Sequence, residues 1–417
     1  MVERDGLAEV VDSPVSACDR LIIQVASEEI ADRRGLHIVV ADDPTGALCR
    51  WAYSLCVDGR ALRVTIASRS LPQARQAQLY AQHLGVQSHV AVCGIDAPMR
   101  PDMALVAQSV DVMIGRTPKS HAELHYLASA LQMSYSNLGA GDIADVHRRD
   151  VKAIFGAHNK HMDRGHNAAL AQHFSQVYAS RGRGKFRALI ARELKVPARP
   201  YRPAQAHTAV GQVYGVGGVF HGAGADPGGQ LLARCVSQEL PRLLNPPQSD
   251  GAVKRALACV DLGCGNGTVS LALLRTWQDM RAEDSRLRAL EILATDIHSD
   301  AVASAELSLA SEIRAGHARV TWDDAAASEL SGSADVVALN PPFHAGSALD
   351  MTCVQPLLAA AARLLRPKGE LYIVFNSHLR YRAIVQRYFV DVSQIARDRR
   401  FTVLRAVRDA DDETGSE

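Results

Sequence analysis

Short apolar runs alternate with amphipathic segments through the first half of the chain. The apolar run at residues 35–43 ends in two acids, and residues 45–55 follow it with helical spacing. The same pattern predicts further strands at 62–67, 90–92 and 111–114, and helices near 103–109 and over 121–133. Strands that alternate with helices predict an α/β fold with a parallel sheet.

The second half repeats this alternation more clearly. Each half has a later strand that leads into a proline-containing turn and an apolar helix, GRTPKS before HAELHYLASAL and NPPFHAGS before CVQPLLAAAARLL. Asp43 and Arg116 hold places in the first half that resemble those of Asp261 and Asn340 in the second. Because the first half lacks a Gly-rich turn and the Asn, we interpret it as a decayed copy without its own catalysis.

The length of 417 residues exceeds what one hydrophobic core usually supports, so two domains are expected. Residues 181–202 carry eight Arg or Lys against one acid, and a stretch rich in Gly, Pro and His follows. We therefore predict a first domain over 1–205 and a second over 206–408. The acidic segment 409–417 is predicted to be a disordered tail.

Composition excludes several classes of protein. Hydrophobic residues make up 47% of the chain and charged residues 22%, as in soluble globular proteins. Lys and Arg number 46 against 45 Asp and Glu, so any contact with RNA has to come from local patches. The apolar runs are too short to span a bilayer and the N-terminus is acidic, which predicts a cytoplasmic protein without a membrane partner.

Metal and disulfide chemistry are not expected. The eight cysteines form no CxxC pair. The histidines of HNKHMDRGH have no cysteine or carboxylate cluster to complete a ligand set, and we interpret that segment as exposed or facing RNA.

The segment VDLGCGNGTVS is the first candidate binding site. An apolar strand ends in Asp261, and Gly263, Gly265 and Gly267, with Asn266 between the last two, turn the chain into a helix. Such glycines let a backbone approach a ligand closely, and nicotinamide, flavin and S-adenosylmethionine enzymes all use them. The acid at the strand end favours S-adenosylmethionine, whose amino-acid part carries an ammonium group.

Two further carboxylates follow later strands. Asp296 ends the run ILATD, where a carboxylate can bind both hydroxyls of a ribose. Asp323 and Asp324 follow VTW, and we expect Asp324 to accept a hydrogen bond from the amino group of an adenine. The alternative in each case is that the acid caps the following helix.

The segment DVVALNPPF carries the predicted catalytic residues, and its Asn340 is also expected to contact the cofactor. The strand delivers Asn340 to its carboxyl end, where ligands bind in such sheets. The Asn340 oxygen and the Pro341 carbonyl can accept both N–H bonds of an exocyclic base amine, and Phe343 can stack on a flipped base. These residues predict methylation of an amino group without a strong base.

Together these motifs resemble class I S-adenosylmethionine-dependent methyltransferases, and more narrowly the bacterial ribosomal RNA guanine-N2 methyltransferases. The resemblance rests on GVFHGAGADPGGQLL, VDLGCGNG, ALNPPFHAG, RLLRPKGELYIVFNSHLRY and FTVLRAV, with weaker echoes over 30–200. It implies two tandem Rossmann-like domains, a degenerate N-terminal one that helps hold RNA and a catalytic C-terminal one. It also implies S-adenosylmethionine as cofactor and ribosomal RNA as partner.

The segments NSHLRY, FTVLRAV and the TPK turn are more similar to the 23S branch than to the 16S branch, which stays the alternative. The resemblance places Phe220 and Asp226 beside the cofactor. Gly222 and Ala225 stand where the family usually has Arg and Leu, so part of the cofactor lid is expected to differ. Naked RNA and an assembly intermediate are both candidate substrates, and the sequence predicts no oligomeric state.

Other classes of protein share parts of this pattern. Protein-glutamine N5-methyltransferases and DNA adenine methyltransferases use a similar turn, the former typically with Tyr where Phe343 stands. The basic stretch at 181–202 favours a nucleic acid over a protein loop. A non-catalytic assembly factor is disfavoured because Asp261, Gly263, Asp296 and Asn340 are all present.

Overall fold

The chain folds into two compact units. The computed structural model describes residues 15–93, 110–135, 150–196, 201–245, 255–342, 349–379 and 381–410, with the backbone alone for 349–353. The first unit comprises Met1–Pro203 with Val216–Gly218, and the second comprises Ala204–Gly215 with Val219–Glu417. The predicted helix at 103–109 and the tail from 411 onward lie outside the described residues. Across the described ranges, every helix is too short or too polar to cross a membrane.

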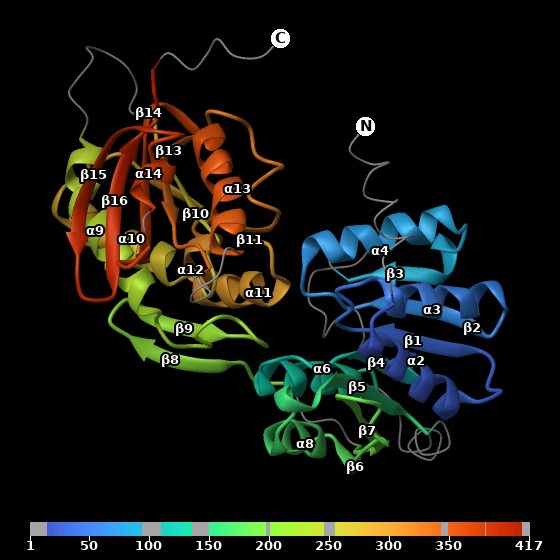
Figure 1. Ribbon diagram of the computed structural model, residues 1–417. Helices are drawn as coiled ribbons and strands as arrows, with labels where there is room; N and C mark the ends of the chain where they lie inside the picture. The colour runs from blue at the N-terminus through green and yellow to red at the C-terminus, as the bar shows by residue number, and fades with distance from the viewer. Residues whose placement is uncertain are drawn as a thin grey trace. The chain divides into compact units, whose positions relative to one another are not determined.

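The first unit contains one seven-stranded sheet in the order β3-β2-β1-β4-β5-β7-β6 (Figure 1). Neighbouring strands from β3 to β5 are parallel, whereas β7 runs antiparallel to both β5 and β6. Its elements are α2 (Ala17–Ile30), β1 (Leu36–Val40), α3 (Ala47–Val57), β2 (Ala61–Ile66), α4 (Leu71–His83), η1 (Gln87–His89), β3 (Val90–Val92), β4 (Val112–Arg116), α6 (His121–Met133), β5 (Lys152–His158), η2 (Asn159–His161), α8 (Arg164–Ala171), β6 (Phe174–Ala179) and β7 (Phe186–Leu194).

The second unit contains a seven-stranded sheet in the order β12-β11-β10-β13-β14-β16-β15 and a separate β8-β9 hairpin. Here β16 is the strand that runs antiparallel to both of its neighbours. The elements are β8 (Ala204–Thr208), β9 (Gly211–Gly215), α9 (Pro227–Leu244), β10 (Leu257–Leu262), α10 (Thr268–Glu283), β11 (Leu290–Asp296), α11 (Ser299–Ser308), α12 (Ala310–Arg314), β12 (Ala318–Trp322), β13 (Ala334–Leu339), α13 (Leu349–Leu364), β14 (Leu365–Asn376), α14 (Arg382–Val385), β15 (Val390–Arg397) and β16 (Phe401–Val407).

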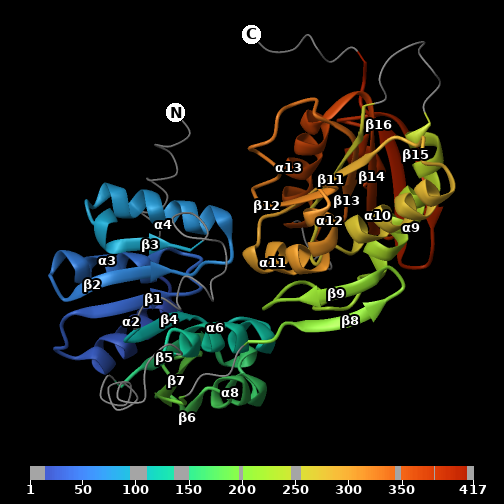
Figure 2. The same ribbon diagram turned by 180° about the vertical axis from the view of Figure 1, so that it is seen from behind.

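The second sheet is buried on both faces, which explains why its strands are continuous apolar runs. Alternate residues of β13 point to opposite faces: Val336 and Ala338 join a core formed with α9 and α10, and Val337 and Leu339 join a core formed with α13. Figures 1 and 2 show α13 on one side of the sheet and α9 and α10 on the other.

The two sheets have the same strand order, which confirms the predicted α/β fold with two tandem copies. An equivalent pair of bonds fixes their register. Asp111 accepts from the Arg33 side chain at 2.6 Å and the His37 amide at 2.8 Å, and Asp335 accepts from the Arg255 side chain at 2.6 Å and the Ala258 amide at 2.9 Å. The equivalence of Asp111 and Asp335 makes Arg116 the counterpart of Asn340.

The same register corrects one detail of the duplication inferred from sequence. Val40 pairs with Ile114 as Asp261 pairs with Ala338, so Val40, and not Asp43, is the counterpart of Asp261. Six residues later each copy has a left-handed glycine that caps the next helix, Gly46 and Gly267. The two turns therefore have the same length, and Asp43 stands where Cys264 stands in the second copy.

Candidate active site

The turn between β10 and α10 has a left-handed backbone at each of its three glycines. The φ angle is 78° at Gly263, 54° at Gly265 and 82° at Gly267, a region in which glycine is favoured. A Cβ added at Gly263 or Gly265 would meet no atom of the described chain within 4 Å, whereas one at Gly267 would come within 3.3 Å of Cα of Ala305 on α11. The first two glycines therefore leave open space beside the turn, and the third allows α10 to pack closely on α11.

Asp261 stabilises this turn through hydrogen bonds to the first turn of α10. Its side chain is buried, and its Oδ2 accepts hydrogen bonds from the Ser270 amide at 3.1 Å and the Ser270 hydroxyl at 2.6 Å. Burial raises the pKa of Asp261 to about 6, although the bonds from Ser270 oppose that change. These bonds satisfy donors in the first turn of α10 and fix the point at which the glycines leave the sheet.

Asn266 ties the glycine turn to the loop at 220–226. Its Nδ2 donates to the main-chain carbonyls of Gly222 at 2.9 Å and Gly224 at 2.8 Å, while its Oδ1 accepts from the Thr268 hydroxyl at 2.7 Å. The bond from Asn266 goes to the main-chain carbonyl of Gly222. It therefore does not depend on the side chain at that position. The Phe220 side chain is 67% exposed and makes an edge contact with the His221 ring.

Asp296 stands at the carboxyl end of β11, the strand next to β10. Its Oδ2 accepts from the Gly265 amide at 3.0 Å and its Oδ1 from the His298 amide at 2.9 Å. A carboxylate has about four acceptor positions, so each oxygen retains capacity for one more donor. The Asp296 carboxylate can therefore accept two hydroxyl groups at the edge of the glycine turn.

The neighbouring acids Asp323 and Asp324 have different surroundings. Asp323 is buried, its Oδ1 accepts from the Asp324 amide at 2.8 Å, and its Oδ2 accepts from the Ser328 amide at 2.9 Å. Asp324 is exposed at the turn that follows β12. The helix considered for these acids to cap is not formed, because residues 324–329 make a turn before β13. Asp323 holds that turn, and the Asp324 carboxylate stays exposed beside it.

Asn340 follows β13 and has one end of its amide fixed. Its Nδ2 donates to Oδ2 of Asp226 at 2.9 Å. A carboxylate accepts hydrogen bonds and does not donate them, so the NH2 group must face Asp226 and the oxygen must face away. That oxygen is buried and has no hydrogen-bond partner in the described part of the chain. Because an unsatisfied buried acceptor is costly, this one is suited to a donor from a bound molecule.

Asp226 orients Asn340 and caps α9 with the same carboxylate. Its Oδ2 also accepts from the Gly229 amide at 2.7 Å, and its Oδ1 lies 3.1 Å from Nε2 of His221. Sequence reasoning missed the contact with Asn340, because 114 residues separate the two positions. An Asp directly before a Pro and two glycines is typical of a helix start, so the capping role of Asp226 could be predicted. The sequence around His221 did not indicate its contact with Asp226.

The remaining residues of the predicted turn are partly described. Pro341 is buried directly after Asn340. Phe343, the predicted stacking residue, lies outside the described residues.

The histidine-rich segment of the first unit makes contacts that the sequence did not suggest. Asp163 lies within 4.8 Å of His121 and His166, a grouping that could hold a metal ion. Asp163 also caps α8 through the Gly165 amide at 2.8 Å, and His166 Nε2 lies 3.1 Å from the Pro118 carbonyl. Both side chains therefore have structural roles without an ion.

The second sheet thus gathers complementary groups at its carboxyl edge. The glycine turn, Asp296 and the loop at 220–226 are linked by hydrogen bonds, and Asp226 joins Asn340 to that loop. Phe220 and Asp324 stand at this edge without a bond to that network among the described residues. The arrangement can bind a molecule with hydroxyl and cationic groups beside a second molecule that presents an N–H donor.

Comparisons with known proteins identify relatives of the chain. The family described as "Methyltransferase small domain" matches residues 211–405. The ribosomal RNA large subunit methyltransferase G of Streptomyces coelicolor is 31% identical over 310 residues, 72% of each chain. Its counterpart in Shewanella amazonensis is 27% identical over 338 residues, 78% of each chain.

A solved structure shares the fold across both units. The T. thermophilus 16S rRNA N2 G1207 methyltransferase (RsmC), in complex with AdoMet and guanosine, matches with a TM-score of 0.65 and 21% identity, over 95% of this chain and 93% of that one. This likeness shows the fold, and the sequence similarity over 72% of the chain shows the family. The chain therefore belongs to the family of the ribosomal RNA large subunit methyltransferases G.

Proposed function

We propose that this rRNA methyltransferase modifies the exocyclic N2 amine of one guanine in 23S ribosomal RNA, with S-adenosylmethionine as the methyl donor. Relatives named for the large subunit match 72% to 78% of the chain, which supports the 23S substrate. The 16S substrate is the second candidate, because the similar solved structure is named for 16S rRNA. A ribosomal substrate agrees with the cytoplasmic location expected from the sequence.

The residues of the glycine turn fit S-adenosylmethionine. Gly263 and Gly265 leave space that a Cβ would fill, so the ligand's amino-acid part can lie against the backbone there. Asp296 has two acceptor positions for the ribose hydroxyls, and the exposed Asp324 can accept from the adenine amine. Asp261 acts by holding the turn in place. When bound, S-adenosylmethionine supplies an electrophilic methyl group.

The unpaired oxygen of Asn340 carries the proposal for the acceptor base. The lone pair of an exocyclic guanine amine is delocalised into the ring, so the amine is a weak nucleophile. A hydrogen bond from that amine to the Asn340 oxygen orients it and favours positive charge on nitrogen as it reacts. Asp226 keeps this oxygen turned toward the base, and is in this account a positioning residue as well as part of the cofactor loop.

Two neighbours of Asn340 complete the proposed pocket. The Pro341 carbonyl would accept the second N–H of the amine, and the Phe343 ring would stack on the flipped base, a contact worth about 1–3 kcal/mol per base. The first unit, Met1–Pro203 with Val216–Gly218, corresponds to the domain predicted at 1–205 and would hold the RNA without catalysis of its own.

The direct test is transfer of labelled methyl groups to protein-free 23S and 16S rRNA, with the modified nucleoside identified by mass spectrometry. N2-methylguanosine in 23S alone is expected. The same nucleoside in 16S alone would move the enzyme to the other substrate. A label on neither RNA, nor on assembled subunits, would contradict the proposal and direct the search to protein glutamine.

A further inference from the structure

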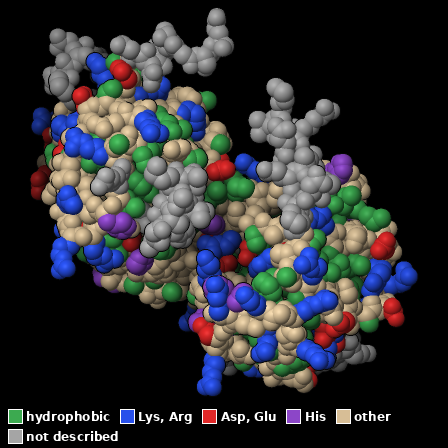
Figure 3. Space-filling view, viewed as in Figure 1, with side chains coloured by type: hydrophobic (Ala, Val, Ile, Leu, Met, Phe, Trp, Pro, Cys, Tyr) green, Lys and Arg blue, Asp and Glu red, His purple; other side chains and the backbone are tan. Residues whose placement is uncertain are grey.

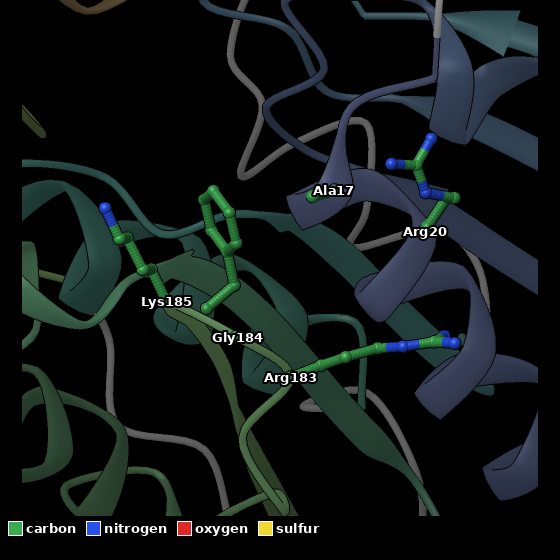
Figure 4. Close-up of a pocket in the computed structure, with 6 residues that line it drawn as sticks. Ala17, Arg20, Arg183, Gly184 and Lys185 are labelled. Atoms are coloured by element: carbon green, nitrogen blue, oxygen red, sulfur yellow. The ribbon is translucent and has the colours of Figure 1, made fainter.

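The first unit has a hollow of about 400 Å³ at the carboxyl edge of its sheet. It lies between the first turn of α2 and the turn that joins β6 to β7 (Figure 4). Its lining residues are Ala17, Arg20, Arg183, Gly184, Lys185 and Phe186. We call this hollow the cationic pocket.

Three of the six lining side chains are positively charged and none is acidic. Arg20 donates to the Val15 carbonyl at 2.5 Å and Arg183 to the amide oxygen of Gln24 at 2.6 Å, both neutral acceptors. Within the described ranges, neither arginine forms an ion pair, and Lys185 has no ion pair either. The two guanidinium groups are therefore held by neutral acceptors that leave their charge in place, and the Lys185 ammonium adds a third positive charge.

The acid closest in sequence on α2 does not offset this charge. Asp19 is fully buried, and its carboxylate accepts from Arg116 Nε at 2.5 Å and from the Thr45 hydroxyl at 2.9 Å. Over the face shown in Figure 3, acidic and basic side chains are interspersed on both units. A site for an anion therefore depends on a local group of cations such as this one.

The turn between β15 and β16 of the second unit is the counterpart of the turn that joins β6 to β7, and the two differ in one charged side chain. Phe186 pairs with His158 on β5 as Phe401 pairs with Asn376 on β14, so the two phenylalanines are counterparts. Three residues earlier, Arg183 stands where the catalytic unit has Asp398. The Asp398 carboxylate accepts from the amide of Phe401 at 2.7 Å and closes that turn on itself.

In the first unit the backbone closes this turn, through bonds of 2.9 Å and 3.2 Å between Arg183 and Phe186, and the Arg183 side chain takes no part in that closure. Gly184 has a φ angle of 58°, and an added Cβ would meet nothing within 4 Å in the described structure. The Phe186 ring is half-buried, with its edge against the His158 ring at 5.4 Å between centroids. The pocket therefore combines three cations with a fixed aromatic ring beside them.

We propose that the cationic pocket binds a phosphate of the RNA backbone. Two guanidinium groups and an ammonium offer forked and point-like donors that match phosphate oxygens. The Phe186 ring can contact the adjoining ribose or an unpaired base. The inference rests on the proposed function, since it identifies where the first unit holds the ribosomal RNA.

The test is the salt dependence of binding to protein-free 23S rRNA by the full-length chain. The double variant Arg183→Ala/Lys185→Ala is compared with Arg63→Ala/Arg75→Ala, which removes two exposed cations from β2 and α4. Each phosphate contact contributes about 0.7–0.9 to the slope of log K against log salt. We expect the pocket variant to lower the slope by about 1, as for the loss of one phosphate contact, and the control variant to leave it unchanged.

Further measurements distinguish a phosphate of RNA from a free phosphate ion, and they test the pocket separately from the proposed methyl transfer. Equal slopes for both variants would overturn the pocket as an RNA site. Saturable binding of inorganic phosphate that is lost in the pocket variant, with RNA affinity unaffected, would also overturn it in favour of a free anion. Methyl transfer by the wild type, measured alongside, tests the proposed function independently, and its rate at saturating RNA should be the same in both variants.

Discussion

The carboxyl edges of the two sheets use the same position in opposite ways. After β13, Asn340 is held by Asp226 at 2.9 Å and keeps a buried oxygen without a partner among the described residues. At the equivalent place, the last residue of β4, Arg116 donates to Asp19 at 2.5 Å and to Ser16 at 2.7 Å. The edge of the second sheet thus retains an unpaired acceptor, whereas the polar groups at the edge of the first sheet are paired with one another.

The turns beside these residues differ in the same sense. By register, Pro44 replaces Gly265, which removes the amide that donates to Asp296, and Ser68 replaces Asp296 itself. Asp42 replaces Gly263 and adds a carboxyl group, whose pKa is raised by burial, where the catalytic turn leaves open space. The two sheets of seven strands in the same order thus differ in a few side chains at the edge where we propose that the second unit binds its cofactor.

The largest expected effect comes from Asn340→Ala, which removes the proposed acceptor. We expect kcat for methyl transfer to fall by about 10²–10³, as for loss of one preorganised hydrogen-bonding group at a reacting centre. Affinity for S-adenosylmethionine, measured by calorimetry, should not change. Asn245→Ala, at the exposed end of α9, is the matched control. A kcat within twofold of wild type would show that Asn340 does not orient the amine.

The buried carboxylate of Asp261 should give the second largest effect, on stability. Its pKa of about 6 lies above the unfolded value of about 3.9, so its contribution is fully present below pH 4 and is lost as the pH rises through 6. The difference corresponds to about 3 kcal/mol. Asp261→Asn should therefore unfold at the same temperature as wild type near pH 4 and at a higher temperature near pH 8. A constant difference at all pH values would contradict the raised pKa.

Arg116→Ala should destabilise the first unit without slowing catalysis. It leaves the fully buried Asp19 without its cation, for which we expect a loss of about 2 kcal/mol in the free energy of unfolding. Although burial raises the pKa of Asp19, bonds from Arg116, Ser16 and Thr45 outweigh it and lower the pKa. The loss should therefore be present at neutral pH and fade as the pH falls below about 4. Arg75→Ala is the control, and unchanged unfolding would contradict the comparison.

The smallest expected effect distinguishes two roles for Asp226. Asp226→Asn retains a good helix cap but can no longer dictate which end of the Asn340 amide faces it. A positioning role predicts that kcat falls by about tenfold, with KM for S-adenosylmethionine unchanged. If KM rises while kcat is kept, Asp226 acts as a direct cofactor ligand and the positioning role is wrong.

Much of this fold was predictable because its signals are local. The helix over 121–133 and the strand at 90–92 match α6 and β3, since apolar periodicity and flanking polar residues define both. The glycine turn was also readable, because three left-handed positions require glycine. The family resemblance contributed the expected two-domain arrangement and the likeness of Phe220 and Asp226 to cofactor residues.

What the sequence did not indicate depends on long-range pairing. The correct counterpart of Asp261 is Val40, which follows from strand register and not from the order of acids along the chain. The role of Asp226 depends on its contact with Asn340, and that of Arg116 depends on its contact with Asp19. Each pair is far apart in sequence, and side-chain type alone gives no sign of it.

The central claim is that one of two sheets of the same topology binds the cofactor, and calorimetric titration of S-adenosylmethionine into the full chain tests it most directly. The account predicts one site per chain, lost in Asp296→Ala and kept in Ser68→Ala, the matched change in the first unit. Two sites per chain, or a site that survives Asp296→Ala and is lost in Ser68→Ala, would contradict it.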